Sequence, residues 1–139
     1  KTLKGHTEAV ISLAIFSNGE KLISASSDNT IKFWDLDSES VDFEITQHSD
    51  EVLSIGLSSD SSKLFSTSKD KTIKIWDTSD GSLIATFERH SGDSVKGTVK
   101  TGDQILSFDA NDVINAWNFG SSGHIKEMRG LLQGITAIA

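Results

Sequence analysis

No cysteine and no proline occur among the 139 residues of the sequence. The absence of cysteine excludes a disulfide framework, a thiolate nucleophile and a zinc site with cysteine ligands. Basic residues are also scarce, because 13 lysines and arginines stand against 20 aspartates and glutamates, which gives a formal net charge of −7. Nucleic-acid phosphates require a basic surface, so we expect no naked DNA or RNA partner.

Long apolar runs are missing as well. No stretch approaches the roughly 20 apolar residues that cross a bilayer, so we expect no membrane insertion. The first residues, 1–6, are not followed by the apolar segment of a signal peptide. A cytoplasmic location is therefore expected. Hydrophobic residues still make up 36% of the chain and charged residues 24%, which is the composition of a globular protein with a buried core.

What the sequence does contain is an internal repeat. Tryptophans recur at intervals of 42 and 41 residues, and histidines recur twice at intervals of 42 residues. The tryptophans are Trp34, Trp76 and Trp117, and the histidines are His6, His48 and His90. Two independent markers with one period predict a tandem array of equivalent units.

Each unit has the pattern of short strands. Apolar residues alternate with their neighbours over 10–16, and tight-turn pairs such as Asn18-Gly19 and Asp80-Gly81 separate such runs. β-Branched and aromatic residues dominate 30–34 and 72–76, where no proline interrupts them. We predict that each unit consists of consecutive antiparallel hairpins.

A period of 40 to 45 residues with four strands per unit resembles the WD-repeat (beta-transducin) family, whose units form the blades of a propeller. The pair Gly5-His6 matches the opening of a unit, and Trp34-Asp35 and Trp76-Asp77 match the end of its third strand. The third unit departs from the pattern, because Trp117-Asn118 lacks the aspartate. The resemblance implies an all-β fold, a partial WD-repeat beta-propeller of about three four-stranded antiparallel blades that form a portion of a larger closed ring.

On this pattern the whole chain, 1–139, is expected to be a single partial propeller. The strands of the first unit are then expected at 10–16, 21–26, 30–36 and 41–46. The expected blades are 7–48, 49–90 and 91–130, with 1–6 as the end of a preceding outer strand and 131–139 as the start of a following inner strand. Closed propellers have 4–8 blades. Ring closure therefore requires further blades, either from the same longer chain or from another chain.

Serine, histidine and aspartate recur together and are the ingredients of an activated nucleophile. One enzyme does not need this set in every unit, so we expect no catalytic site. The resemblance instead implies a buried structural hydrogen-bond network in each blade. Its expected members are His6, Ser24, Asp28 and Trp34; His48, Ser66, Asp70 and Trp76; and His90, Ser107, Asn111 and Trp117.

No metal site or cofactor is expected. Histidines one unit apart would be separated by a whole sheet, and no two of them are close enough in sequence to share a local site. The segments 35–37 and 77–80 contain closely spaced aspartates, as a calcium loop does, but both lack its closing glutamate.

The resemblance also implies binding residues early in each inner strand and just before the turn aspartate. The corresponding residues are Ala9, Ile11 and Ser27; Glu51, Leu53 and Lys69; and Ser94, Lys96 and Ala110. Ile11 and Leu53 are either apolar anchors for a partner or packing residues between blades.

The leading hypothesis is a non-catalytic scaffold that presents the loop faces of a propeller to protein or peptide partners. One alternative is a reader of a basic or modified peptide tail that uses the acidic residues Glu8, Asp50, Glu51 and Asp93. Another is the non-catalytic portion of a larger enzyme whose site lies in other blades. A cytoskeletal or ciliary association is a possibility at the level of the family.

Overall fold

A computed structural model describes residues 2–88, 95–101, 104–109, 113–118 and 124–129. These residues form twelve strands in three four-stranded sheets, with no helix in the described ranges. The first sheet contains β1 (Val10–Ile15), β2 (Lys21–Ser26), β3 (Ile31–Asp35) and β4 (Ser40–Ile45). The second contains β5 (Val52–Leu57), β6 (Lys63–Ser68), β7 (Ile73–Asp77) and β8 (Leu83–Phe87). The third contains β9 (Val95–Thr101), β10 (Gln104–Asp109), β11 (Val113–Asn118) and β12 (His124–Arg129).

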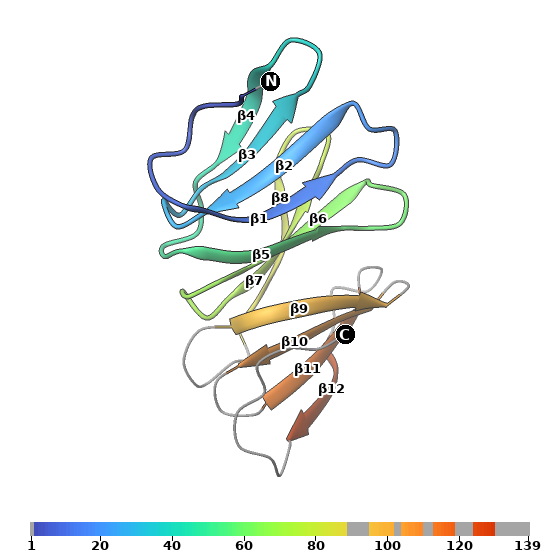
Figure 1. Cartoon of the computed structure of the whole chain (residues 1–139). Helices are drawn as coiled ribbons and strands as arrows, with labels where there is room; N and C mark the ends of the chain where they lie inside the picture. Colours follow the sequence, from blue (N-terminus) through green and yellow to red (C-terminus); the bar gives the residue numbers. More distant parts are fainter. Residues whose placement is uncertain (1, 89–94, 102–103, 110–112, 119–123, 130–139) are drawn as a thin grey trace.

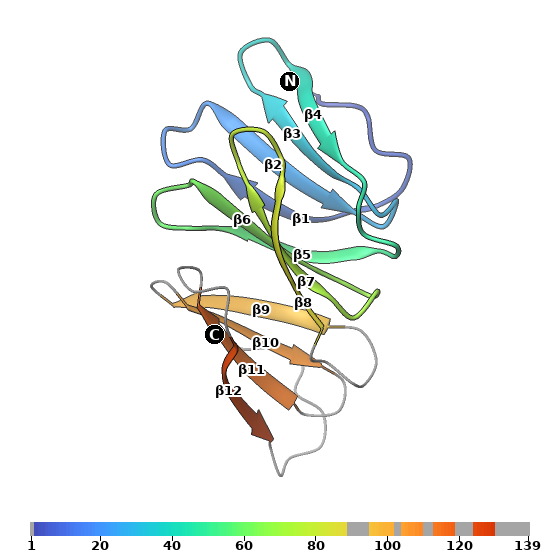
Figure 2. The same cartoon turned by 180° about the vertical axis from the view of Figure 1, so that it is seen from behind.

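Every sheet is an antiparallel meander whose spatial order follows the chain. The three sheets are stacked side by side, and β5 lies between β1 and β9 (Figure 1). The strands β4 and β8 lie at the opposite edge of their sheets, away from these three strands (Figure 2). The prediction of four-stranded antiparallel units is confirmed.

Residues 2–6 lie in no strand of this structure. A strand requires a hydrogen-bonded neighbour, so their assignment to the outer strand of a preceding blade stays a prediction. Residues 131–139 are outside the described residues.

The core lies between the sheets. Alternate residues of a strand face opposite sides, so the second sheet can pack on both neighbours at once. Towards the first sheet it presents Val52, Ile55, Leu64 and Trp76, and towards the third it presents Phe65, Ile73, Ile75 and Phe87. Burying an apolar side chain of this size contributes about 1.5–3 kcal/mol, so these clusters stabilise the contact between sheets.

The turn between β7 and β8 also packs tightly against the first sheet. Gly81 has a positive φ of 73°, and a Cβ at this position would lie 2.8 Å from the ring of Phe43. The backbone conformation therefore favours glycine, and the close approach of the two sheets leaves no room for a side chain. The predicted Asp80-Gly81 turn thus contributes to packing between sheets.

Candidate functional site

In the first sheet, four residues predicted as a network are in contact. The Trp34 indole Nε1 donates a hydrogen bond of 2.7 Å to Ser24 Oγ, which lies 2.6 Å from His6 Nε2. The other ring nitrogen, His6 Nδ1, lies 2.9 Å from Asp28 Oδ2. A carboxylate only accepts, so in the neutral ring Nδ1 carries the proton and Nε2 accepts from the Ser24 hydroxyl. The four side chains therefore form one continuous chain of donors and acceptors.

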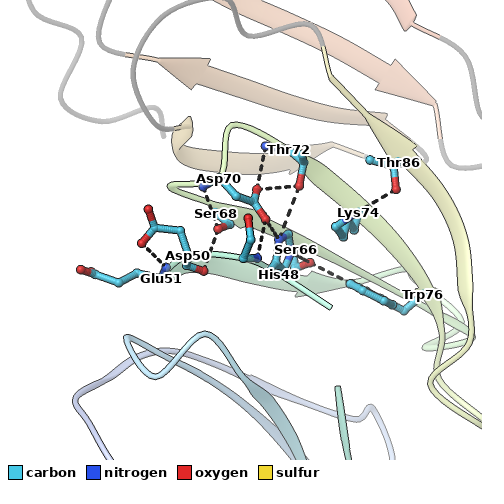
Figure 3. A network of polar contacts seen from close by, with 11 residues as sticks. His48, Asp50, Glu51, Ser66, Ser68, Asp70, Thr72, Lys74, Trp76 and Thr86 are labelled. Carbon is cyan, nitrogen blue, oxygen red and sulfur yellow. Dashed lines mark hydrogen bonds and ion pairs between the residues drawn. The ribbon is translucent and has the colours of Figure 1, made fainter. Parts of the chain in front are cut away.

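The same geometry recurs in the second sheet (Figure 3). Trp76 Nε1 donates to Ser66 Oγ over 2.8 Å, and Ser66 Oγ lies 2.7 Å from His48 Nε2. His48 Nδ1 lies 2.6 Å from Asp70 Oδ2. A catalytic serine needs access to substrate, whereas Ser66, His48 and Trp76 are buried. Both the recurrence and the burial favour a structural role.

The third sheet shows one part of this network. Trp117 is buried and its Nε1 donates to Ser107 Oγ over 2.7 Å, as in the other two sheets. His90 and Asn111 lie outside the described residues.

Two threonines belong to the network although they were not among the predicted members. The hydroxyls of Thr30 and Thr72 donate to Oδ1 of Asp28 and Asp70, both over 2.7 Å. A signal was available in the sequence, because the two threonines are 42 residues apart and each follows its aspartate by two positions. The third unit has Val113 at this position, which cannot donate.

Both network aspartates are held as carboxylates. Burial raises the pKa of Asp28, but hydrogen bonds from Thr30, the backbone of Thr7 and His6 outweigh it and hold the pKa well below its ordinary value. Burial likewise raises the pKa of Asp70, and hydrogen bonds from His48 and Thr72 lower it further than burial raises it. Each carboxylate is therefore stabilised by several donors that would lose their acceptor if it were removed.

Six predicted binding residues lie where β1 and β5 begin and where their neighbours β2 and β6 end, and we call them the rim cluster. They are Ala9, Ile11, Ser27, Glu51, Leu53 and Lys69. The backbone N–H of Ser27 donates to the carbonyl of Ala9 over 2.9 Å, and that of Lys69 donates to Glu51 over 3.0 Å. Glu51 also pairs with the Lys69 ammonium at 2.6 Å. The rim cluster therefore repeats its backbone geometry from one sheet to the next.

A β-bulge occurs at the same place in all three inner strands. The ladder passes from Val10 to Ser12 and from Val52 to Ser54, which leaves Ile11 and Leu53 without a partner across the sheet. In β9 the ladder skips Lys96 in the same way. A bulge turns the extra residue out of the regular alternation. Of the two extra residues, Ile11 is 46% exposed and Leu53 is half-buried. The other two residues predicted for the third unit, Ser94 and Ala110, lie outside the described residues.

The open face of β1 is a second surface with exposed apolar residues. Leu13 and Ile15 are exposed there, and the neighbouring hollow of about 510 Å³ is lined by Leu22 and Trp34 among others. The residues of β5 at the same positions pack against the first sheet. The face of β1 thus has the composition of a packed interface.

The described residues contain no group of three or more histidines, aspartates or glutamates that could hold a metal ion. Within that part of the chain, no helix is long and apolar enough to cross a membrane.

Comparison with known proteins identifies the fold. The family model for the WD domain, G-beta repeat, matches residues 1–35 and 40–77. The chain belongs to the WD40 repeat family. The WD40 repeats of RRP9, in a crystal structure, superpose with a TM-score of 0.88 and 26% identity over 94% of this chain and 41% of that chain. The predicted all-β propeller architecture is thereby confirmed, and each four-stranded sheet corresponds to a WD40 blade.

Two curated proteins are similar over segments of 40 and 34 residues. WD repeat-containing protein srw1 of Schizosaccharomyces pombe is 50% identical over 40 residues, which is 28% of this chain and 7% of that protein. Nuclear distribution protein PAC1 of Candida albicans is 59% identical over 34 residues, 24% of this chain and 7% of that protein. The chain therefore corresponds in extent to part of a larger WD40 propeller.

Proposed function

We propose that the chain is a non-catalytic interaction scaffold that binds protein or peptide partners through the rim cluster. The observation that carries this proposal is the repeated bulge, which turns Ile11 and Leu53 out of the ladder beside the Glu51–Lys69 ion pair. An exposed apolar side chain surrounded by polar groups has the character of an interaction hot spot. The buried, repeated His–Ser–Asp network supports a non-catalytic role.

A double substitution tests this function. The full-length protein with Ile11→Asp and Leu53→Asp is expected to lose most partners that co-purify with the unaltered protein, because both anchors become charged. Val41→Asp is the matched control, since Val41 is exposed and apolar but lies on β4. Circular dichroism and thermal melts show whether each variant is folded. Retention of every partner by the folded double variant would contradict the proposal.

The acidic residues of the same rim support a second candidate, a reader of basic or modified tails. Glu8 and Asp50 are exposed, while Glu51 is neutralised by Lys69, so only part of the acidic charge is available; Asp93 lies outside the described residues. Binding through Glu8 and Asp50 would weaken steeply as ionic strength rises, whereas binding through Ile11 would not. A titration of salt against the affinity of a purified partner separates the two.

We further propose that another blade covers the open face of β1, supplied by the same longer chain or by another chain. The support is the matching face of β5, which the first blade covers. Light scattering after size-exclusion chromatography tests this idea: a β-rich oligomer of defined mass indicates closure by other copies, and a folded monomer in which Leu13 stays exposed contradicts a need for closure.

A further inference from the structure

The exposed large apolar residues lie on the inner strand β1 and on the outer strands β4 and β8, where Val41 and Leu83 are equivalent, and the two locations have different explanations. Those on β1 border the open flank of the first blade, where a neighbouring blade would cover most of them. Leu83 and Ile84 are 41% and 46% exposed, and they lie on β8 of the second blade. This blade already has a neighbour on each side (Figure 2), so completion of the ring would leave both residues exposed.

The outermost strand β8 also has a free hydrogen-bonding edge. It is the last strand of its sheet, paired only with β7 among the described residues. Its sequence, Leu83–Phe87, contains no charged residue. Proteins normally protect such an edge with charges, because a row of unpaired N–H and C=O groups pairs readily with another extended chain.

The equivalent strand of the first blade is protected in this way. Residues 42 positions earlier place Asp42 at the site of Ile84 and Glu44 at the site of Thr86. Asp42 pairs with Lys21 at 2.6 Å, and Glu44 pairs with Lys32. In the first blade, Lys21 and Lys32 therefore each have a carboxylate partner on β4 of the same sheet.

In the second blade one of these lysines lacks a carboxylate. Lys74 occupies the position of Lys32, and within the described part of the chain its ammonium donates only to the Thr86 hydroxyl, at 3.2 Å (Figure 3). No ion pair reaches Lys74 from the described residues. The edge of β8 thus combines a strand without charged side chains, an exposed isoleucine and a half-buried lysine for which the described residues supply no carboxylate.

We propose that the β8 edge binds an extended peptide segment as a fifth antiparallel strand of this blade. The segment would carry an acidic residue opposite Thr86, where its carboxylate can pair with Lys74, and an apolar residue opposite Ile84. Ile84 is the extra residue of a β-bulge, because the ladder with β7 passes from Leu83 to Ala85. Beyond the bulge the strand alternates regularly, so the two peptide residues that face Ile84 and Thr86 stand two positions apart. The acidic residue of the peptide would thus do for Lys74 what Glu44 on β4 does for Lys32, since β8 has Thr86 at the position of Glu44.

The test uses an acetylated, amidated probe peptide, Thr-Thr-Glu-Thr-Val-Thr-Thr, and the full-length protein. Titration followed by nuclear magnetic resonance or fluorescence anisotropy is expected to show saturable binding. Hydrogen exchange at the amides of 83–87 is expected to slow when the peptide is added. The same peptide with proline replacing its central threonine cannot complete the ladder and should not bind.

Variants of the protein identify the contacts. Thr86→Glu supplies an internal carboxylate to Lys74, as Glu44 does for Lys32, and should weaken the probe about tenfold by removing its charge partner and repelling its glutamate. Ile84→Asp, which copies Asp42, should weaken it by a similar factor, and Lys74→Gln about threefold. Asp42→Asn on β4 is the matched control and should leave the affinity unchanged.

The interpretation does not depend on the rim cluster, since the Ile11→Asp, Leu53→Asp variant should bind the probe normally. The proposal is overturned if the probe binds no better than its proline version. It is also overturned if the folded Thr86→Glu variant binds with unchanged affinity.

Discussion

The first two blades carry the same residue pattern, but the matching faces of their inner strands have different surroundings. Ile55 on β5 packs against the first blade and is 7% exposed, whereas its counterpart Leu13 on β1 is 61% exposed. Both strands have the same alternation and the same bulge. The difference therefore comes from the neighbour, and it shows that alternation determines which residues share a face but not whether that face is covered.

The largest expected effect concerns the network that both blades share. Asp28→Ala and Asp70→Ala should each destabilise the protein by about 3 kcal/mol, because the buried donors of histidine and threonine lose a charged acceptor. Asn111→Ala, at the equivalent position of the third unit, should cost only about 1 kcal/mol, because a neutral acceptor is lost. Urea denaturation of the three variants measures this, and equal losses would contradict the argument.

The second prediction addresses the two faces directly. Ile55→Ala should cost about 2–4 kcal/mol in the 139-residue chain, through lost burial and a cavity. Leu13→Ala should have almost no effect there, since its side chain is exposed. If another blade covers β1 in the full-length protein, the cost of Leu13→Ala should rise there towards that of Ile55→Ala. If Ile55→Ala and Leu13→Ala destabilised the 139-residue chain equally, the two faces would not differ in burial as described.

Acid should weaken the first two blades through the same two carboxylates. The pKa of Asp28 and of Asp70 is lower in the folded protein than the ordinary value of 3.8. The unfolded chain therefore binds protons first as the pH falls, so this stabilisation is complete well above pH 3.8 and is lost progressively below it. Urea midpoints measured across this range should fall less steeply in an Asp28→Asn, Asp70→Asn variant; parallel curves would argue against these groups.

The smallest expected change in stability concerns Thr67 in the second blade, the counterpart of Ala25 in the first blade. Among the described residues, its buried hydroxyl finds no hydrogen-bond partner. Thr67→Val keeps the shape and removes the unsatisfied group, so it should stabilise the protein by up to about 1 kcal/mol. Thr72→Val is the control, because the Thr72 hydroxyl donates to Asp70 and its removal should be destabilising. Thermal melts that show a loss for Thr67→Val would be the contrary result.

Much of the fold could be predicted because the repeat carries redundant local signals. The period of Trp34 and Trp76, the alternation within each strand and the turn residues all depend on neighbours in sequence. The contacts among His6, Ser24 and Asp28 followed from the family pattern rather than from spacing alone. Thr30 and Thr72 were missed because a threonine two residues after an aspartate is common in turns and becomes distinctive only when its hydroxyl is seen on the carboxylate.

The sequence by itself determined the unit, its four strands and the residues that share each face, because backbone alternation and turn chemistry act over a few residues. Only the tertiary structure decided which faces are covered and which edges are protected. Leu13 and Ile55 differ through the presence of a neighbouring sheet, and Lys32 and Lys74 differ through the residue placed opposite them on the outer strand. Burial and ion pairing depend on residues brought together from distant positions, so they are properties of the folded chain.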